Sequence, residues 1–164
     1  MAKQWNQQGV TLIELLVVIA IIGIMTSVGV IVASSLGPDM RLNSAARDIR
    51  SAFQKAKLTA VKENADCLVV FDTSSPGSYQ ACIDTDGDDS CDSDEEVIVQ
   101  KDFSDSPNIS LAGAVFSSGN YIQFNSRGST GSIMGWSAGW VNCTNAQGDR
   151  RTITVTRTGE VSVD

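Results

Sequence analysis

The sequence contains no histidine among its 164 residues. Catalytic arrangements of the Ser-His-Asp and Cys-His types, and histidine metal sites, are therefore excluded. None of the four cysteines belongs to a C-x-x-C pair, which argues against zinc-ribbon and thioredoxin-like sites. The chain also lacks a positive net charge. Its formal charge is -7, which argues against a generally basic nucleic-acid-binding protein. We expect no enzyme activity and no required cofactor.

The negative charge is concentrated in one segment of the chain. Eight acidic residues between positions 84 and 96 account for more than the whole net charge: Asp84, Asp86, Asp88, Asp89, Asp92, Asp94, Glu95 and Glu96. The acidity therefore belongs to one loop and not to the surface as a whole.

The longest apolar stretch runs from Gly9 to Ala33. A helix of ~20 apolar residues is long enough to cross the ~30 Å hydrocarbon core of a bilayer. We therefore predict a transmembrane helix over residues 10–36, and Lys3 with the initial amine favours an N-terminus in the cytoplasm. An ordinary signal peptide cut near Ser34 is the alternative, but Glu14 and the length of the apolar run argue against it.

Glu14 is the charged residue of this stretch. An ionisable group in a membrane helix is energetically expensive and is a functional-site hypothesis by default. The alternative is a position close enough to the interface for the carboxylate to reach headgroups or water.

The sequence around Glu14 resembles the N-terminus of a known family. The run Gly9-Val10-Thr11-Leu12-Ile13-Glu14-Leu15-Leu16, followed by a long apolar helix, resembles type IV pilins and type II secretion pseudopilins. The resemblance implies that a prepilin peptidase removes a leader of residues 1–9 by cutting between Gly9 and Val10, and then N-methylates Val10. The positive amine of Val10 in one subunit would match the Glu14 carboxylate of a neighbour, and this pair would set the axial register of a filament.

Residues 37–63 have the pattern of a second, amphipathic helix. Pro38 predicts a break or kink after the first helix, because proline disfavours helical geometry in the residue before it. Beyond Pro38, apolar residues recur at steps of three and four: Leu42, Ala45, Ala46, Ile49, Ala52, Phe53, Ala56 and Ala60. We predict that this stripe packs against the chain's own globular domain while the basic face stays exposed.

Residues 64–164 have the pattern of a β-rich domain. The runs 67–72 and 78–83 flank a Ser-Ser-Pro-Gly turn and predict a hairpin. Further strands are predicted at 96–103, 109–116, 121–125, 132–136, 139–143, 151–156 and 160–163. Four aromatic residues are expected in the core of this glycine-rich domain: Tyr121, Phe124, Trp136 and Trp140.

The order of these segments predicts an α+β fold. It fits the pilin-like architecture that the resemblance implies, in which a long N-terminal hydrophobic helix continues into an amphipathic helix packed on an antiparallel β-sheet domain. Two segments of the β-rich domain are similar to the GspH/FimT branch of the family: Phe124-Asn125-Ser126-Arg127-Gly128 and Ile153-Thr154-Val155-x-x-x-Gly159-x-Val161.

The acidic loop has the spacing of a calcium site. Oxygen-bearing side chains fall at positions 1, 3, 5, 7, 9 and 12 of an EF-hand loop: Asp84, Asp86, Asp88, Ser90, Asp92 and Glu95. Asp89 stands where an EF-hand has glycine, and the flanking segments are predicted strands. The alternative is a solvated acidic hairpin loop that keeps a sheet edge from pairing. Calcium is therefore a candidate ligand.

The four cysteines allow three pairings into two disulfides. An even number of cysteines in an exported domain fits two such bonds. A Cys82–Cys91 bond would close a small loop and limit its disorder, and it would leave Cys67 with Cys143. Buried free thiols are the alternative.

The resemblance implies a structural role. We expect a minor pseudopilin of a type II secretion system or of a type IV pilus-like filament. Its expected partners are other pilin-like subunits, the prepilin peptidase and an inner-membrane assembly platform. Its expected location is the bacterial inner membrane, crossed once, with the C-terminal domain periplasmic or extracellular.

Two other functions remain open at this point. One is a minor pilin for DNA uptake, and the other is a membrane-anchored calcium-binding β domain. The FimT type is associated with DNA uptake through a basic Gly-Arg-x-Arg element, whereas this chain has Gly159-Glu160-Val161-Ser162. We therefore expect no nucleic-acid partner.

Overall fold

The structure is a computed structural model that describes residues 10–106, 108–117, 119–131 and 139–164, with the side chains of 27–36 left out. The predicted leader 1–9, the predicted strand 132–136 and Trp136 lie outside the described residues. The chain consists of two compact units, Met1–Gly37 and Pro38–Asp164.

A single helix, α1 (Leu12–Glu63), belongs to both units. It begins with Thr11 as its N-cap, because the Oγ1 atom of Thr11 accepts a hydrogen bond from the Glu14 N–H at 3.3 Å. It ends in the left-handed turn of a Schellman motif. Asn64 has φ 52°, and the Ala65 N–H donates to the Ala60 carbonyl at 3.2 Å. Local sequence therefore sets both ends of the helix.

The predicted break at Pro38 is wrong, because α1 continues through this residue, whereas a kink there stays a prediction. Proline lacks the N–H that would bond to the carbonyl four residues earlier. The loss of that one bond does not end a helix of 52 residues.

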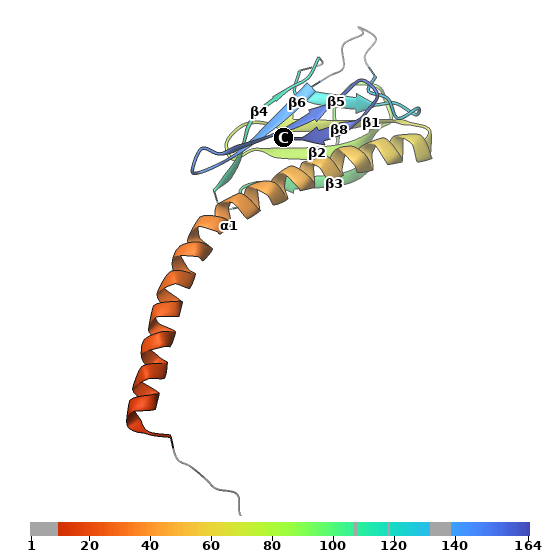
Figure 1. The fold of residues 1–164 in the computed structure, drawn as a ribbon. Coiled ribbons are helices and arrows are strands. Elements are labelled where there is room, and N and C mark those ends of the chain that lie inside the picture. The colour runs from red at the N-terminus through yellow and green to blue at the C-terminus, as the bar shows by residue number, and fades with distance from the viewer. Residues whose placement is uncertain (1–9, 107, 118, 132–138) are drawn as a thin grey trace, which may run out of the picture. The chain divides into compact units, whose positions relative to one another are not determined.

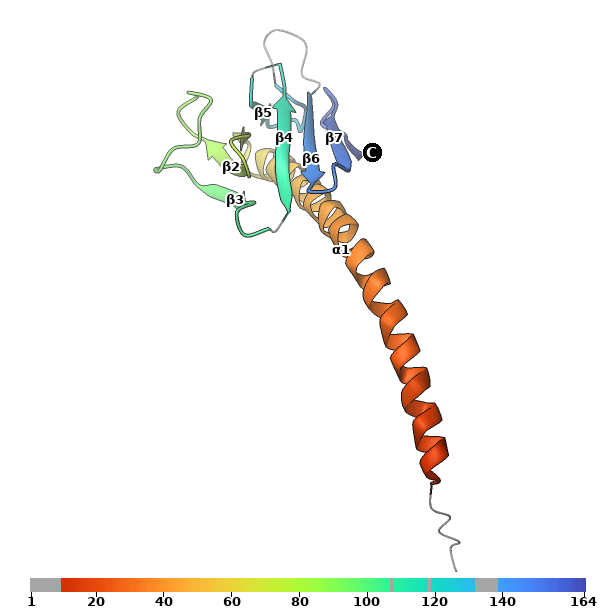
Figure 2. The ribbon, with the colours of Figure 1, turned by 90° about the vertical axis from the view of Figure 1, so that its left-hand side faces the viewer.

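The unit Pro38–Asp164 contains two four-stranded antiparallel sheets (Figures 1 and 2). The first has the order β3-β2-β1-β5, with β1 (Asp66–Asp72), β2 (Ser78–Asp84), β3 (Val97–Asp102) and β5 (Tyr121–Phe124). The second has the order β4-β6-β7-β8, with β4 (Ile109–Val115), β6 (Gly139–Asn145), β7 (Arg150–Val155) and β8 (Val161–Val163). The predicted hairpin is confirmed, since β1 pairs with β2 in a register that places Phe71 opposite Tyr79.

The core lies between both sheets and the part of α1 that follows Pro38. All eight residues of the predicted stripe are buried, and they share one cluster with side chains from β1, β2, β4, β5, β6 and β7. Phe53 is fully buried, and its ring centroid lies 5.6 Å from that of Phe71 and 6.3 Å from those of Phe116 and Phe124. The prediction that the stripe packs on its own domain is confirmed.

The predicted set of core aromatics is only partly right. Phe124 is fully buried, but Tyr121 is half-buried and Trp140 is 37% exposed. The alternation along β6 explains Trp140, because its neighbours Gly139 and Val141 face inward and the strand turns successive side chains to opposite faces.

Two glycine turns meet at Lys57 on α1. The Lys57 ammonium donates to the carbonyl oxygens of Thr158 and Gly159 at 3.1 and 3.0 Å. A Cβ at Gly159 would lie 2.5 Å from the carbonyl oxygen of Gly128, and a Cβ at Gly128 would lie 3.1 Å from the Lys57 Cε. The two sequence segments 124–128 and 153–161 therefore lie next to each other where both contact Lys57 of α1.

Replacing Gly159 by alanine should destabilise this junction. Its φ of 70° disfavours a side chain, and the added Cβ would meet the Gly128 carbonyl, so we expect a loss of about 2–4 kcal/mol in the free energy of unfolding. Gly148→Ala is the matched control, because Gly148 has φ 89° and nothing lies within 4 Å of an added Cβ. Denaturant unfolding of the full chain in detergent measures both variants. Equal losses would contradict the steric explanation.

Candidate functional site

The N-terminal part of α1 has apolar side chains on all its faces. Every large apolar residue from Val10 to Met25 is at least 47% exposed. Five of them, from Leu15 to Ile19, are consecutive, and a helix turns by about 100° per residue, so no face of this segment is polar. A helix that is hydrophobic all round requires an apolar environment.

Within the part of the chain that the structure describes, no helix is long and apolar enough to cross a membrane. The transmembrane helix over residues 10–36 stays a prediction.

Glu14 lies in the first turn of α1, and its side chain is exposed. A carboxylate at this position interacts favourably with the positive end of the helix macrodipole. Among the described residues, no ion pair with Glu14 is present. The carboxylate is therefore accessible at the start of a helix that is otherwise apolar.

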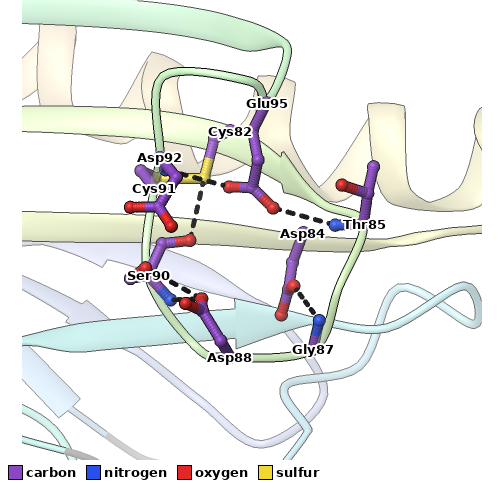
Figure 3. Close-up of a disulfide and its surroundings, with 9 residues drawn as sticks. All are labelled: Cys82, Asp84, Thr85, Gly87, Asp88, Ser90, Cys91, Asp92 and Glu95. Carbon is purple, nitrogen blue, oxygen red and sulfur yellow. Dashed lines mark hydrogen bonds between the residues drawn. A yellow bond between two sulfur atoms is a disulfide. The ribbon is translucent and has the colours of Figure 1, made fainter.

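The acidic loop joins β2 to β3 and is closed by a disulfide (Figure 3). Cys82 and Cys91 are bonded, as predicted, and are nine residues apart in the sequence. Cys82 faces away from α1, because its neighbour Ala81 belongs to the core cluster under the helix and successive strand residues face opposite ways. The loop therefore lies on the face of the first sheet that α1 does not cover.

Glu95 holds the two sides of the loop together. Its Oε1 accepts a hydrogen bond from the Thr85 N–H at 2.9 Å, and its Oε2 accepts one from the Asp92 N–H at 3.3 Å. The side chain lies across the loop between these two residues, and the residue is only 8% exposed (Figure 3). Both carboxylate oxygens are thus occupied by backbone donors.

Asp84 is a second buried carboxylate in the loop, and only one of its oxygens is satisfied. Its Oδ1 accepts a hydrogen bond from the Gly87 N–H at 2.6 Å. Its Oδ2 is buried and has no hydrogen-bond partner among the described residues. Burial raises the pKa of Asp84 above its usual range, and the negative charges of Glu95, Asp86 and Asp89 act in the same direction, whereas the Gly87 N–H lowers it.

The structure brings three of the six predicted calcium ligands together. Asp84, Asp86 and Asp88 each offer a carboxylate oxygen, and these oxygens lie within 4.8 Å of one another. Ser90 contacts this group through Asp88, because its N–H and its hydroxyl both donate to Asp88 Oδ1 at 2.8 Å. Asp92 and Glu95 do not belong to the group.

Two features of the loop were not predictable from the spacing. Asp89 takes the left-handed conformation, with φ 62°, at the position where an EF-hand has glycine, which a short polar side chain tolerates. The backbone contacts of Glu95 also carry no sequence signal, because they depend on how the loop folds back. A group formed by Cys82, Cys91 and Glu95 is not a thiolate site, since the disulfide consumes both thiols.

The predicted Cys67–Cys143 disulfide is wrong. Both thiols are free and buried, Cys67 on β1 of the first sheet and Cys143 on β6 of the second. Desolvation by burial raises the pKa of Cys67 to about 11 and that of Cys143 to about 12. The two residues are inert components of the core.

The comparison with known proteins covers both parts of the chain. The family model described as type II transport protein GspH matches residues 45–159, and the model described as prokaryotic N-terminal methylation motif matches residues 6–33. No curated protein sequence matches the chain.

The fold is similar to that of a solved structure. The type IV minor pilin FimU of Pseudomonas aeruginosa, in one crystal form, has a TM-score of 0.56 and 15% sequence identity, with 75% of this chain and 87% of that chain covered. A second crystal form of FimU gives a TM-score of 0.50 and 12% identity, with 75% and 92% covered.

The cysteine assignment predicts the number of reactive thiols. A thiol reagent should modify two residues in the unfolded chain without reductant and four after reduction, and almost none in the native chain at neutral pH, because the free thiols are buried. Non-reducing peptide mapping should recover one bridged pair, Cys82 with Cys91. A peptide containing Cys67 bonded to Cys143 would contradict the structure.

Proposed function

Because the chain belongs to the family of type II transport protein GspH and carries the N-terminal methylation motif, we propose that it is a minor subunit of a pilin-like filament. Its function would be to assemble with other pilin-like subunits in a type II secretion system or a type IV pilus-like system. This family and fold support a structural role, and we propose no catalytic one.

The exposed apolar segment from Val10 to Met25 carries this proposal. The unit Pro38–Asp164 encloses its own core, to which the residues of α1 from Leu42 to Ala60 belong. The apolar segment belongs to no such core and requires another apolar environment, because burying apolar surface contributes roughly 25 cal/mol per Å². Before assembly that environment would be the inner membrane, and after assembly it would be the packed helices of neighbouring subunits.

Glu14 would set the axial register, which is the displacement of one subunit relative to the next along the filament. A carboxylate in an apolar environment requires a partner of opposite charge. Removal of residues 1–9 would create such a partner at the amine of Val10, and methylation would preserve its charge. The Thr11 cap supports this arrangement, because it satisfies the N–H of Glu14 within the helix and leaves the carboxylate accessible to a neighbour.

The proposed processing predicts the mass of the mature protein. A chain extracted from the membranes of its host should begin at N-methylated Val10, because a prepilin peptidase would cut after Gly9. Intact mass and N-terminal sequencing measure this directly. A chain that begins at Met1 or Ala2, or at Ser34, would contradict the proposal.

The proposed pairing predicts the effect of neutralising Glu14. A pair that contributes about 1.4 kcal/mol per subunit changes an assembly equilibrium about tenfold. Glu14→Gln should therefore lower the amount of this protein recovered in sheared filaments about tenfold or more. Asp39→Asn is the control, since Asp39 is an exposed carboxylate on α1 beyond the apolar stretch. Normal incorporation of Glu14→Gln, or an equal loss in both variants, would rule out the pairing.

A further inference from the structure

We propose that Asp84, Asp86 and Asp88 form a Ca²⁺ site in the loop between β2 and β3, centred on the buried, unpartnered Oδ2 of Asp84. Asp84 ends β2 and Asp86 and Asp88 follow in the loop, so all three residues lie within the unit Pro38–Asp164 and the proposed site does not rest on the proposed filament assembly.

The buried oxygen of Asp84 is the observation that points to a cation. Asp84 is 7% exposed, and its Oδ2 has no hydrogen-bond partner among the residues that the structure describes. A buried polar atom without a partner costs about 1–3 kcal/mol, and more when the group is charged. A cation bound to this oxygen would remove the cost and would also offset the repulsion among the three carboxylates.

The three carboxylates are close enough together for one calcium ion. Their oxygens lie within 4.8 Å of one another. Ca²⁺ binds oxygen at 2.3–2.6 Å, so two ligands on opposite sides of the ion are about 4.6–5.2 Å apart. One ion can therefore contact all three residues, and Figure 3 shows the carboxylate of Asp84 inside the loop, beside Gly87.

The ligand set differs from that of an EF-hand. An EF-hand closes its coordination shell with a bidentate glutamate at position 12. Here Glu95 occupies that position, but its two oxygens accept hydrogen bonds from Thr85 and Asp92. Glu95 and the Cys82–Cys91 disulfide are positioning elements, because they hold the loop closed around the three aspartates.

Calorimetric titration of CaCl2 into the full chain in detergent, with the disulfide intact, tests the site. We expect a Kd of about 10⁻⁴–10⁻³ M, the range of extracellular calcium modules, and weaker binding of MgCl2, which demands stricter octahedral geometry. Asp84→Asn should weaken calcium binding by about tenfold or more, because it removes the central anionic ligand. Asp94→Asn is the matched control, since Asp94 is exposed in the same loop and outside the cluster, and we expect less than about a twofold change.

Thermal unfolding gives a second measurement. Calcium should raise the melting temperature of the unaltered chain and of Asp94→Asn, but not that of Asp84→Asn, since a ligand that binds the folded state stabilises it. Asp86→Asn and Asp88→Asn keep the test decisive if Asp84→Asn fails to fold, because both residues are exposed and both variants should also weaken binding. Absence of binding at about 10 mM CaCl2, or equal affinity in the aspartate variants and the control, would overturn the proposal.

Discussion

The burial of one stripe of α1 is the interaction on which the globular unit depends. Among the described strands, none of the first sheet pairs with a strand of the second. Side chains from both sheets instead meet the helix between Leu42 and Ala60 in one cluster. Phe53 contacts aromatic rings from β1 and β5 of the first sheet and from the segment that follows β4 of the second. Phe71 of β1 also stacks directly on Phe116, with 5.6 Å between the ring centroids, so the helix completes a core that both sheets share.

The same helix has a different chemical character before Gly37. From Val10 to Met25 the large apolar residues lie on every face and are exposed. From Leu42 to Ala60 eight apolar residues form one buried stripe, and Leu58 is the large apolar residue that stays exposed outside it. A strictly one-sided stripe lets a helix complete a domain, and an all-round apolar surface lets it enter lipid or a bundle of similar helices. One continuous element therefore carries two patterns of apolar residues, and the boundary between the two units lies between them.

The sequence predicted most of the elements of the fold, because each depends on local periodicity. The stripe of α1, the β1–β2 hairpin and the later strands all follow from spacings of two, three or four residues. The division into two sheets and the absence of a Cys67–Cys143 bond did not follow, since both depend on pairing between distant segments. Trp140 was misplaced for a related reason. Its residue type suggested burial, but its place in the alternation of β6 decided its exposure.

The acidic loop shows the same limit at the level of a site. Spacing alone treated Asp84 and Glu95 as equivalent ends of one ligand set, yet the fold buries both carboxylates and treats them differently. Glu95 accepts two backbone hydrogen bonds and has become part of the structure, whereas one oxygen of Asp84 is left without a partner among the described residues. A structural role alone explains Glu95. It does not explain the carboxyl group of Asp84, because an amide of the same shape would cost less to bury than a charged carboxylate.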